Sequence, residues 1–159
     1  MTTEDDFLKL DNQLCFVLYA GSRAVTRLYR SILEGLGLTY PQYLVMLVLW
    51  EHGSLGVNDI GARLHLDSGT LTPLLKRLEA AGLITRQRLA TDERKVMITL
   101  TEKGAALKTQ AAAVPRELLC RSGLSIEEFL LLKKTLTDLI RKMEGSNQDT
   151  AACTNLPET

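Results

Sequence analysis

The sequence predicts a mainly α-helical protein with one small β-hairpin in its second half. Apolar residues recur at helical spacing over most of the 159 residues. The spacing changes to a partial alternation only between Leu83 and Leu100, where strands are expected. The composition, with 45% hydrophobic and 24% charged residues, is typical of one globular domain.

Two helices are expected in the first third of the chain. Apolar residues follow helical spacing over 5–33 without a proline, which predicts one long helix with Gly21 as a tolerated weak point. A second helix should begin at Thr39 or Tyr40, before a proline in its first turn, and run to about Glu51. Its centre is apolar on nearly every side, so we expect it in the core.

A short helix, a turn and an amphipathic helix are expected next. They cover Val57–Leu64, His65–Gly69 and a segment from Thr70 that stops before Gly82. Pro73 lacks an amide hydrogen, so the third segment must begin late or lose one helical bond. At 100° per residue, one side of it is predicted to bury Leu71, Leu74, Leu75 and Leu78. The opposite side carries Gly69, Thr70, Thr72, Pro73, Lys76 and Arg77.

A β-hairpin and two further helices complete the expected elements. The strands are Leu83–Arg88 and Lys95–Leu100, joined by a charged loop that contains Arg94. Helices are then expected from 101 to about 114, where Pro115 ends or kinks the first, and from 125 to about 144. The second of these starts with a capping box, Ser125 to Glu128. Residues 146–159 are small and polar, and we expect them to be disordered.

The order of these parts indicates a DNA-binding winged helix-turn-helix. Hydroxyls and cations on the helix from Thr70 are of the kind that reach phosphates and base edges, and Arg94 on the hairpin suits a narrow minor groove. The formal net charge is zero, but residues 63–95 hold seven Lys or Arg and four acids, which makes a local positive field. Taken alone, the same helix is equally compatible with an ordinary surface helix.

Several other classes of protein are disfavoured by the composition. The acidic N-terminus does not resemble a signal peptide, and the longest apolar run, Tyr43–Trp50, is too short to cross a membrane. We therefore expect a cytoplasmic protein without a membrane partner. An odd number of cysteines without a CxxC pair, and only two histidines, predict no disulfide framework, metal site or cofactor. We expect no enzymatic activity.

Residues 57–104 resemble the core of the MarR family of bacterial transcription regulators. The most specific features are Asp-Ser-Gly-Thr-Leu-Thr at 67–72, Leu-Glu-x-x-Gly-Leu-Ile at 78–84 and Asp-x-Arg at 92–94. The resemblance implies a single domain over 1–145, with a winged helix-turn-helix at 40–100. It also implies a homodimer formed by the helices of 5–36 and 101–145, and an inverted-repeat operator. The candidate DNA-binding residues are Ser68, Thr70, Thr72, Pro73, Lys76, Arg77, Arg86, Asp92 and Arg94, with Arg94 braced by Asp92 in the minor groove.

Cys15 is the candidate signal-sensing residue. A lone cysteine among apolar residues of a helix is most often a small buried hydrophobe. However, Tyr19 lies one helical turn on and can offer its hydroxyl. Tyr29 lies about 21 Å further along the axis than Cys15, so the two meet only across an antiparallel pair of helices in a dimer. Tyrosine hydroxyls against a thiolate would stabilise the anion and raise its reactivity.

The Asp-Asn-Gln-Leu-Cys stretch at 11–15, together with Tyr19, Tyr29 and Tyr40, resembles the OhrR subgroup of that family. Its members are repressors that sense organic hydroperoxides. The resemblance implies that Cys15 is oxidised to a sulfenic acid and that Cys120 of the partner chain resolves it as an intersubunit disulfide, which releases the DNA. Cys153 has no evident place in this pattern.

Three other functions remain open at this point. A MarR-type regulator released by a small aromatic ligand would use Cys15 only as a structural residue. A thiol peroxidase would need a catalytic histidine or nucleophile loop that the sequence does not indicate. A winged helix used only for protein contacts would not need Arg94 for its affinity.

Overall fold

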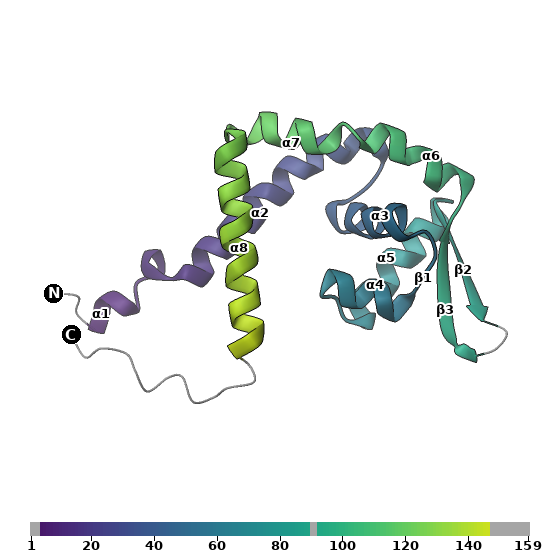
Figure 1. Cartoon of the computed structure of the whole chain (residues 1–159), viewed down its shortest axis with the longest axis horizontal. Coiled ribbons are helices and arrows are strands. Elements are labelled where there is room, and N and C mark those ends of the chain that lie inside the picture. The colour runs from purple at the N-terminus through teal and green to yellow at the C-terminus, as the bar shows by residue number, and fades with distance from the viewer. Residues whose placement is uncertain (1–3, 90–91, 147–159) are drawn as a thin grey trace. The chain divides into compact units, whose positions relative to one another are not determined.

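A computed structural model describes residues 4–89 and 92–146, except for the side chains of 4–5, 89, 92–94 and 146 (Figure 1). The chain divides into two compact units, one up to Leu118 and one from Leu119 on. The predicted class is confirmed, since helices dominate and the strands form one small antiparallel sheet. Cys153 and the predicted disordered tail, apart from Ser146 at the end of the last helix, lie outside the described residues.

The predicted long first helix is wrong, because the segment is broken twice before Leu14. The break leaves Cys15 in the first turn of a helix rather than in the middle of one. Gly21 lies within the last of the three resulting pieces without interrupting it, as predicted. The pieces are α1 (Glu4–Phe7), the 3-10 turn η1 (Leu10–Asn12) and α2 (Leu14–Leu33).

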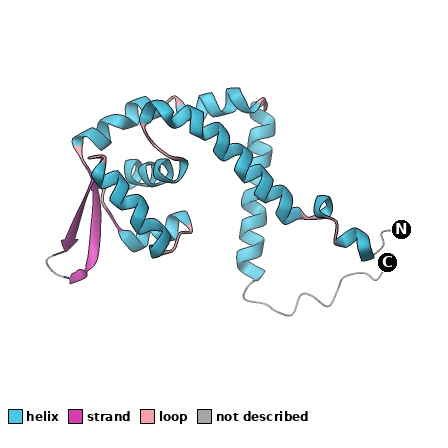
Figure 2. Cartoon of the chain, turned by 180° about the vertical axis from the view of Figure 1, so that it is seen from behind, coloured by secondary structure: helices cyan, strands magenta, loops and turns pink. Residues whose placement is uncertain are grey.

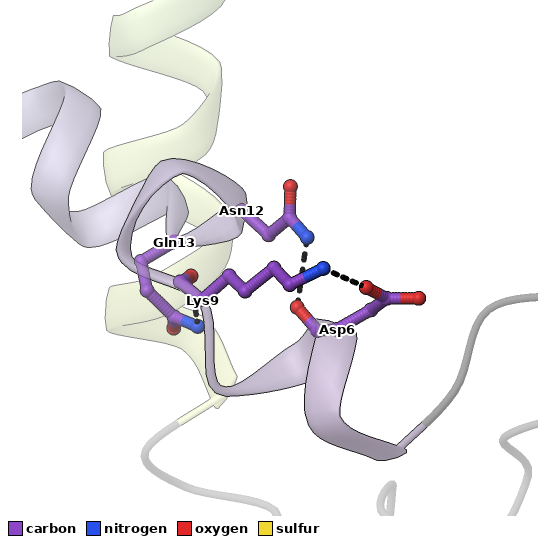
Figure 3. Close-up of polar contacts among 4 residues, drawn as sticks. All are labelled: Asp6, Lys9, Asn12 and Gln13. Atoms are coloured by element: carbon purple, nitrogen blue, oxygen red, sulfur yellow. Dashed lines mark hydrogen bonds and ion pairs between the residues drawn. The ribbon is translucent and has the colours of Figure 1, made fainter.

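Side-chain amides replace helical hydrogen bonds at the break (Figure 3). Asn12 Nδ2 donates to the carbonyl of Asp6 at 2.7 Å. Gln13 Nε2 donates to the carbonyl of Phe7 and, at 3.2 Å, to that of Lys9. Such side chains offer the backbone an alternative to the helix, which explains why apolar spacing alone failed to find the break.

Helix α3 (Tyr40–His52) begins as predicted, with a proline in its first turn, and it also has a capping box that was not predicted. The backbone N–H of Thr39 donates to Gln42 Oε1 at 2.8 Å. The short turn η2 (Glu34–Leu36) precedes it. The predicted place of this helix in the core is confirmed, since it buries Tyr43, Val45, Met46 and Leu49.

The helix-turn-helix consists of α4 (Val57–Leu64), which has the predicted bounds, and α5 (Ser68–Ala80). Helix α5 begins two residues earlier than predicted, because Asp67 caps it by accepting the backbone N–H of Thr70 at 2.8 Å. Its apolar face is narrower than predicted, since Leu74 is only partly buried. The fully buried leucines are Leu71, Leu75 and Leu78.

Three strands form the sheet in the order β1–β3–β2, and Figure 2 shows the two long strands of the hairpin in magenta. The hairpin strands extend further into the expected charged loop than predicted, with an irregular register after Arg88. A third strand was not predicted, because two residues carry no recognisable alternation. Its Leu55 pairs with Ile98. The strands are β1 (Leu55–Gly56), β2 (Ile84–Leu89) and β3 (Asp92–Leu100).

The start of α6 (Glu102–Ala111) packs directly on the turn between α5 and β2. A Cβ atom on Gly104 would lie 2.0 Å from the carbonyl oxygen of Leu83, so only glycine fits there. Thr101 Oγ1 donates to the carbonyl of Gly82 at 2.7 Å and accepts the N–H of Gly104 at 3.0 Å. Trp50 Nε1 donates to the carbonyl of Gly104 at 2.9 Å, which joins α3 to the same point.

The helix from 101 ends at Ala111, before Pro115, and a separate helix then begins. This second helix, α7 (Val114–Ser122), was not predicted, although a proline suits the first turn of a helix. Helix α8 (Ile126–Ser146) begins with the predicted capping box. Ser125 N donates to Glu128 Oε2 at 2.8 Å, and Glu128 N donates to Ser125 Oγ at 3.2 Å.

Among the described residues, no single helix is long and apolar enough to cross a membrane. In the described part of the chain, one pair of helical segments reaches that length and apolarity together, α2 with η2 and α3, and this pair is bent by 67°.

Candidate DNA interface and redox site

The exposed face of α5 brings most of the predicted DNA-binding side chains together. Thr72 is half-buried, and its Oγ1 donates to the carbonyl of Ser68 at 2.6 Å. Thr70 Oγ1 donates to Asp67 Oδ2 at 2.9 Å. Both hydroxyl protons are thus used within the protein, which leaves the two oxygens as acceptors for donors on base edges. The exposed members of the set are Ser68, Thr70, Pro73, Lys76 and Arg77.

Asp67 fixes the start of this helix, although the sequence placed it only within the expected turn His65–Gly69. The backbone N–H of Thr70, and next its hydroxyl, hold the pKa of the Asp67 carboxyl below its usual value. Since α5 begins at Ser68, Pro73 lies inside it. Of the two predicted outcomes, the helix therefore loses one bond, the one to the carbonyl of Gly69.

Arg86 of β2 links the hairpin to α5. Its Nη1 lies 3.6 Å from Glu79 Oε2 of α5. Its Nε is buried without a hydrogen-bond partner among the described residues. Arg86 lines an open groove of about 360 Å³ with Thr72 of α5, Asn58 of α4 and Lys95 of β3. Two residues predicted from separate elements, Thr72 and Arg86, thus face one groove.

Asp92 and Arg94 lie on β3, close to the tip of the hairpin, which extends beyond α4 and α5 (Figure 1). Their side chains lie outside the described part of the structure. The predicted bracing of Arg94 by Asp92 therefore stays a prediction.

Cys15 is exposed and is the second residue of α2. Tyr19, one turn further, is 58% exposed. Its hydroxyl accepts a hydrogen bond from Arg23 Nη1 at 3.2 Å, and the guanidinium carbon lies 5.5 Å from the ring centroid. Arg23 was missed in the sequence, although its spacing of four residues from Tyr19 is the signal that would have found it.

Large apolar side chains that lie close to Cys15 in the sequence are exposed in the single chain. A second exposed apolar group lies on α8, in the other unit. Exposed apolar clusters of this kind mark surfaces that contact another molecule. The first group comprises Phe7, Leu8, Leu10, Leu14 and Val17. The second comprises Ile126, Phe129, Leu130, Leu131, Leu132, Ile140 and Met143.

Tyr29 and Tyr40 pack against each other, with ring centroids 4.5 Å apart. Tyr43, which the sequence did not single out for the site, lies 5.8 Å from Tyr29. Burial, with a contribution from Tyr40 and Tyr43, raises the pKa of Tyr29 to about 12. Burial also raises the pKa of Tyr40 and Tyr43. Tyr19, ten residues before Tyr29 on α2, is about 15 Å away along the axis and outside this cluster.

Cys120 is exposed on α7. It is the second residue of the unit that begins at Leu119.

Comparison with known proteins finds transcription regulators. Residues 27–111 match the family model described as transcriptional regulator SarA/Rot. The organic hydroperoxide resistance transcriptional regulator of Bacillus subtilis (strain 168) is 50% identical over 147 residues, which are 92% of this chain and 100% of that protein.

Among solved structures, reduced AbfR bound to DNA is 39% identical, with a TM-score of 0.74 over 90% of this chain and 98% of that one. A disulfide-formed AbfR is 42% identical, with a TM-score of 0.59 over 86% of this chain and 96% of that one. AbfR is a protein of Staphylococcus epidermidis. The fold, the helix-turn-helix and these relatives agree: the chain is a DNA-binding transcription regulator of the MarR family, in the branch of the organic hydroperoxide resistance regulators.

Proposed function

We propose that the protein is a repressor that binds an inverted-repeat operator as a homodimer and leaves it when an organic hydroperoxide oxidises Cys15. The observation that carries the proposal is the exposure of Cys15 in the first turn of α2, among exposed apolar side chains. The class of oxidant follows from the 50% identity to an organic hydroperoxide resistance regulator.

Helix α5 supplies the major-groove contacts of this proposal. Its free acceptor oxygens suit amino groups of bases, and its cations suit phosphates or guanine. Arg86, which lines the open groove beside Thr72 and Lys95, is suited to a phosphate oxygen. Arg94, with Asp92, is assigned to the minor groove from the sequence. The α5 contacts are those of Ser68, Thr70, Thr72, Pro73, Lys76 and Arg77.

The exposed apolar groups on α1–α2 and on α8 support a homodimer, because a second copy would cover them. In an antiparallel pair of α2 helices, Cys15 of one chain faces the partner's Tyr29. Because Tyr40 packs on Tyr29, the partner's Tyr40 would lie close to the same Cys15. With a pKa of about 12, Tyr29 is protonated at neutral pH, and its hydroxyl can donate a hydrogen bond to a thiolate.

The proposed first step is attack of the Cys15 thiolate on the terminal oxygen of the hydroperoxide. The O–O bond breaks, the other oxygen takes a proton and leaves as an alcohol, and Cys15 becomes a sulfenic acid. The sulfur is oxidised by two electrons and the hydroperoxide is reduced. The reacting form of Cys15 is the thiolate, because the thiolate and not the thiol is the nucleophile.

The proposed second step is attack of the partner's Cys120 thiolate on the sulfenic sulfur. An S–S bond forms as the S–O bond of the sulfenic acid breaks, and the departing hydroxide takes a proton from the solvent to become water. The exposure of Cys120 and the existence of a disulfide form of a 42% identical relative support this step. The new bond pulls on the dimer helices and moves the two α5 helices out of the spacing that fits successive major grooves.

Fluorescence anisotropy of a labelled operator duplex, selected with the reduced protein, tests this function. Cumene hydroperoxide should release the wild-type protein, and Cys15→Ser should stay bound. Peroxide-induced release of Cys15→Ser would overturn the proposal. Release of both proteins by an aromatic acid without oxidation would favour a ligand-gated regulator in its place.

Non-reducing electrophoresis tests the second step separately. Wild type should form a disulfide-linked dimer after peroxide treatment, and Cys120→Ser should not. A linked dimer that forms in Cys120→Ser but not in the double variant Cys120→Ser/Cys153→Ser would assign the resolving thiol to Cys153.

A further inference from the structure

The hydrogen bond between Arg23 and Tyr19 fixes the direction in which the tyrosine hydroxyl can act. A guanidinium group has five N–H donors and no acceptor, so the Tyr19 oxygen must be the acceptor in this bond. The hydroxyl proton of Tyr19 is therefore left for another acceptor. Among the described residues, no hydrogen bond uses it.

The geometry of α2 indicates where that acceptor lies. Side chains on a helix lean toward its N-terminus, so the side chain at position i+4 covers the turn of position i. Arg23 leans over Tyr19, as the 5.5 Å between its guanidinium carbon and the ring centroid records. By the same rule Tyr19 leans toward the turn that carries Cys15, an exposed thiol one turn before it.

We propose that Arg23 is a positioning residue of the peroxide sensor, which holds Tyr19 as a hydrogen-bond donor toward the Cys15 thiolate. This inference rests on the proposed function. Arg23 acts in two ways. It occupies the Tyr19 oxygen, so that the tyrosine donates rather than accepts, and it polarises the O–H bond, which strengthens the bond to an anion.

The reactivity of Cys15 toward iodoacetamide, followed by mass spectrometry across a pH series, tests the proposal. The full-length chain carries Cys120→Ser and Cys153→Ser, so that Cys15 is the only thiol. Arg23→Met should slow alkylation near neutral pH by about threefold to tenfold. The difference should vanish at high pH, where the thiol is ionised in both proteins. A loss of packing around Cys15 would instead change the rate at every pH.

Two further variants test that Arg23 acts through Tyr19. In a protein that already carries Tyr19→Phe, Arg23→Met should change the alkylation rate of Cys15 much less than it does in the parent, which has the tyrosine hydroxyl. Arg27→Met is the matched control, because it removes an exposed arginine one turn further along α2, and its rate should equal that of the parent.

Three results would overturn the proposal. Arg23→Met could alkylate as fast as the parent, or it could remain slower than the parent at high pH. The third is that Arg23→Met slows alkylation as much in the Tyr19→Phe background as in the parent. Each of these results leaves the proposed function standing if Cys15→Ser still fails to respond to peroxide. Conversely, release of Cys15→Ser by peroxide would remove the sensor function whatever Arg23 does.

Discussion

Asp67 Oδ1 accepts the backbone N–H of Thr70 at 2.8 Å, and Asp67 Oδ2 accepts the Thr70 hydroxyl at 2.9 Å. A single carboxylate thus caps α5 and orients one of the residues assigned to base contacts. The start of the DNA-facing helix and the hydrogen-bonding polarity of its surface depend on one side chain.

Asp67→Ala should therefore weaken operator binding and lower the melting temperature by roughly 2–4 °C, because the N–H of Thr70 loses its partner. Asp67→Asn, which retains an acceptor for the cap, should melt close to wild type.

The pKa of Asp67 is lowered in the folded state, so its contribution to stability is present above the ordinary pKa of the carboxyl. This contribution is lost as the pH falls through the lowered value, and pH-dependent calorimetry of wild type and Asp67→Asn checks it. An Asp67→Ala protein with wild-type melting and operator affinity would contradict the cap.

Gly104→Ala should destabilise the fold by about 3 kcal/mol or more, because the new Cβ would meet a backbone oxygen, Leu83 O, that cannot move aside. Urea unfolding measures the loss. Gly145→Ala on α8 is the control, since nothing lies within 4 Å of its Cβ position. Its free energy of unfolding should be unchanged or slightly higher. Equal stability of the two variants would contradict the packing described for α6.

Arg86→Met should reduce operator affinity by about threefold to tenfold at moderate salt and lower the slope of log K against log salt by about 1, because one phosphate contact is lost. Anisotropy titrations at several salt concentrations separate this from a loss of base recognition. Arg116→Met, an exposed arginine of α7 remote from α5 in sequence, should keep the wild-type slope. An unchanged slope in Arg86→Met would exclude Arg86 from the phosphate contacts.

Gln13→Leu should allow helix to run through the break before Leu14, because it removes the side-chain donor to the carbonyls of Phe7 and Lys9. Helix content in circular dichroism should rise slightly, and alkylation of Cys15 should slow as the cysteine leaves the first turn of α2. Lys9→Met, which removes only an exposed ion pair with Asp6, should behave as wild type (Figure 3). Faster alkylation in Gln13→Leu would contradict this role of the break.

The elements that the sequence predicted best are those with a local signal. The start of α3 was predicted from the proline in its first turn and that of α8 from the capping box Ser125–Glu128, and both features are present. The break before Leu14 has no such signal, because apolar spacing continues through residues whose amides bond to the backbone. Strand β1 exists only through its pairing with β3, a tertiary interaction.

The candidate site divides in the same way. The division of α5 into a buried and an exposed side follows from helical periodicity within one element, and the prediction differs from the structure only at Leu74 and Thr72, which are both partly buried. The groove that joins Thr72 to Arg86 depends on how the hairpin lies against α5, which no local pattern encodes. The pairing of Tyr29 with Tyr40 likewise requires α2 and α3 to be placed together.

The contact of Gly104 with Leu83 has a mechanical consequence. Helix α6 begins on the turn between α5 and the hairpin, with hydrogen bonds from Thr101 to the carbonyl of Gly82 and from Lys103 to that of Ala81. Because backbone packing and hydrogen bonds hold this junction, we expect almost no relative motion between α6 and the turn. We therefore expect a rotation of α6 to turn α5 and the hairpin as one rigid lever, so that a small twist becomes a large displacement at the hairpin tip.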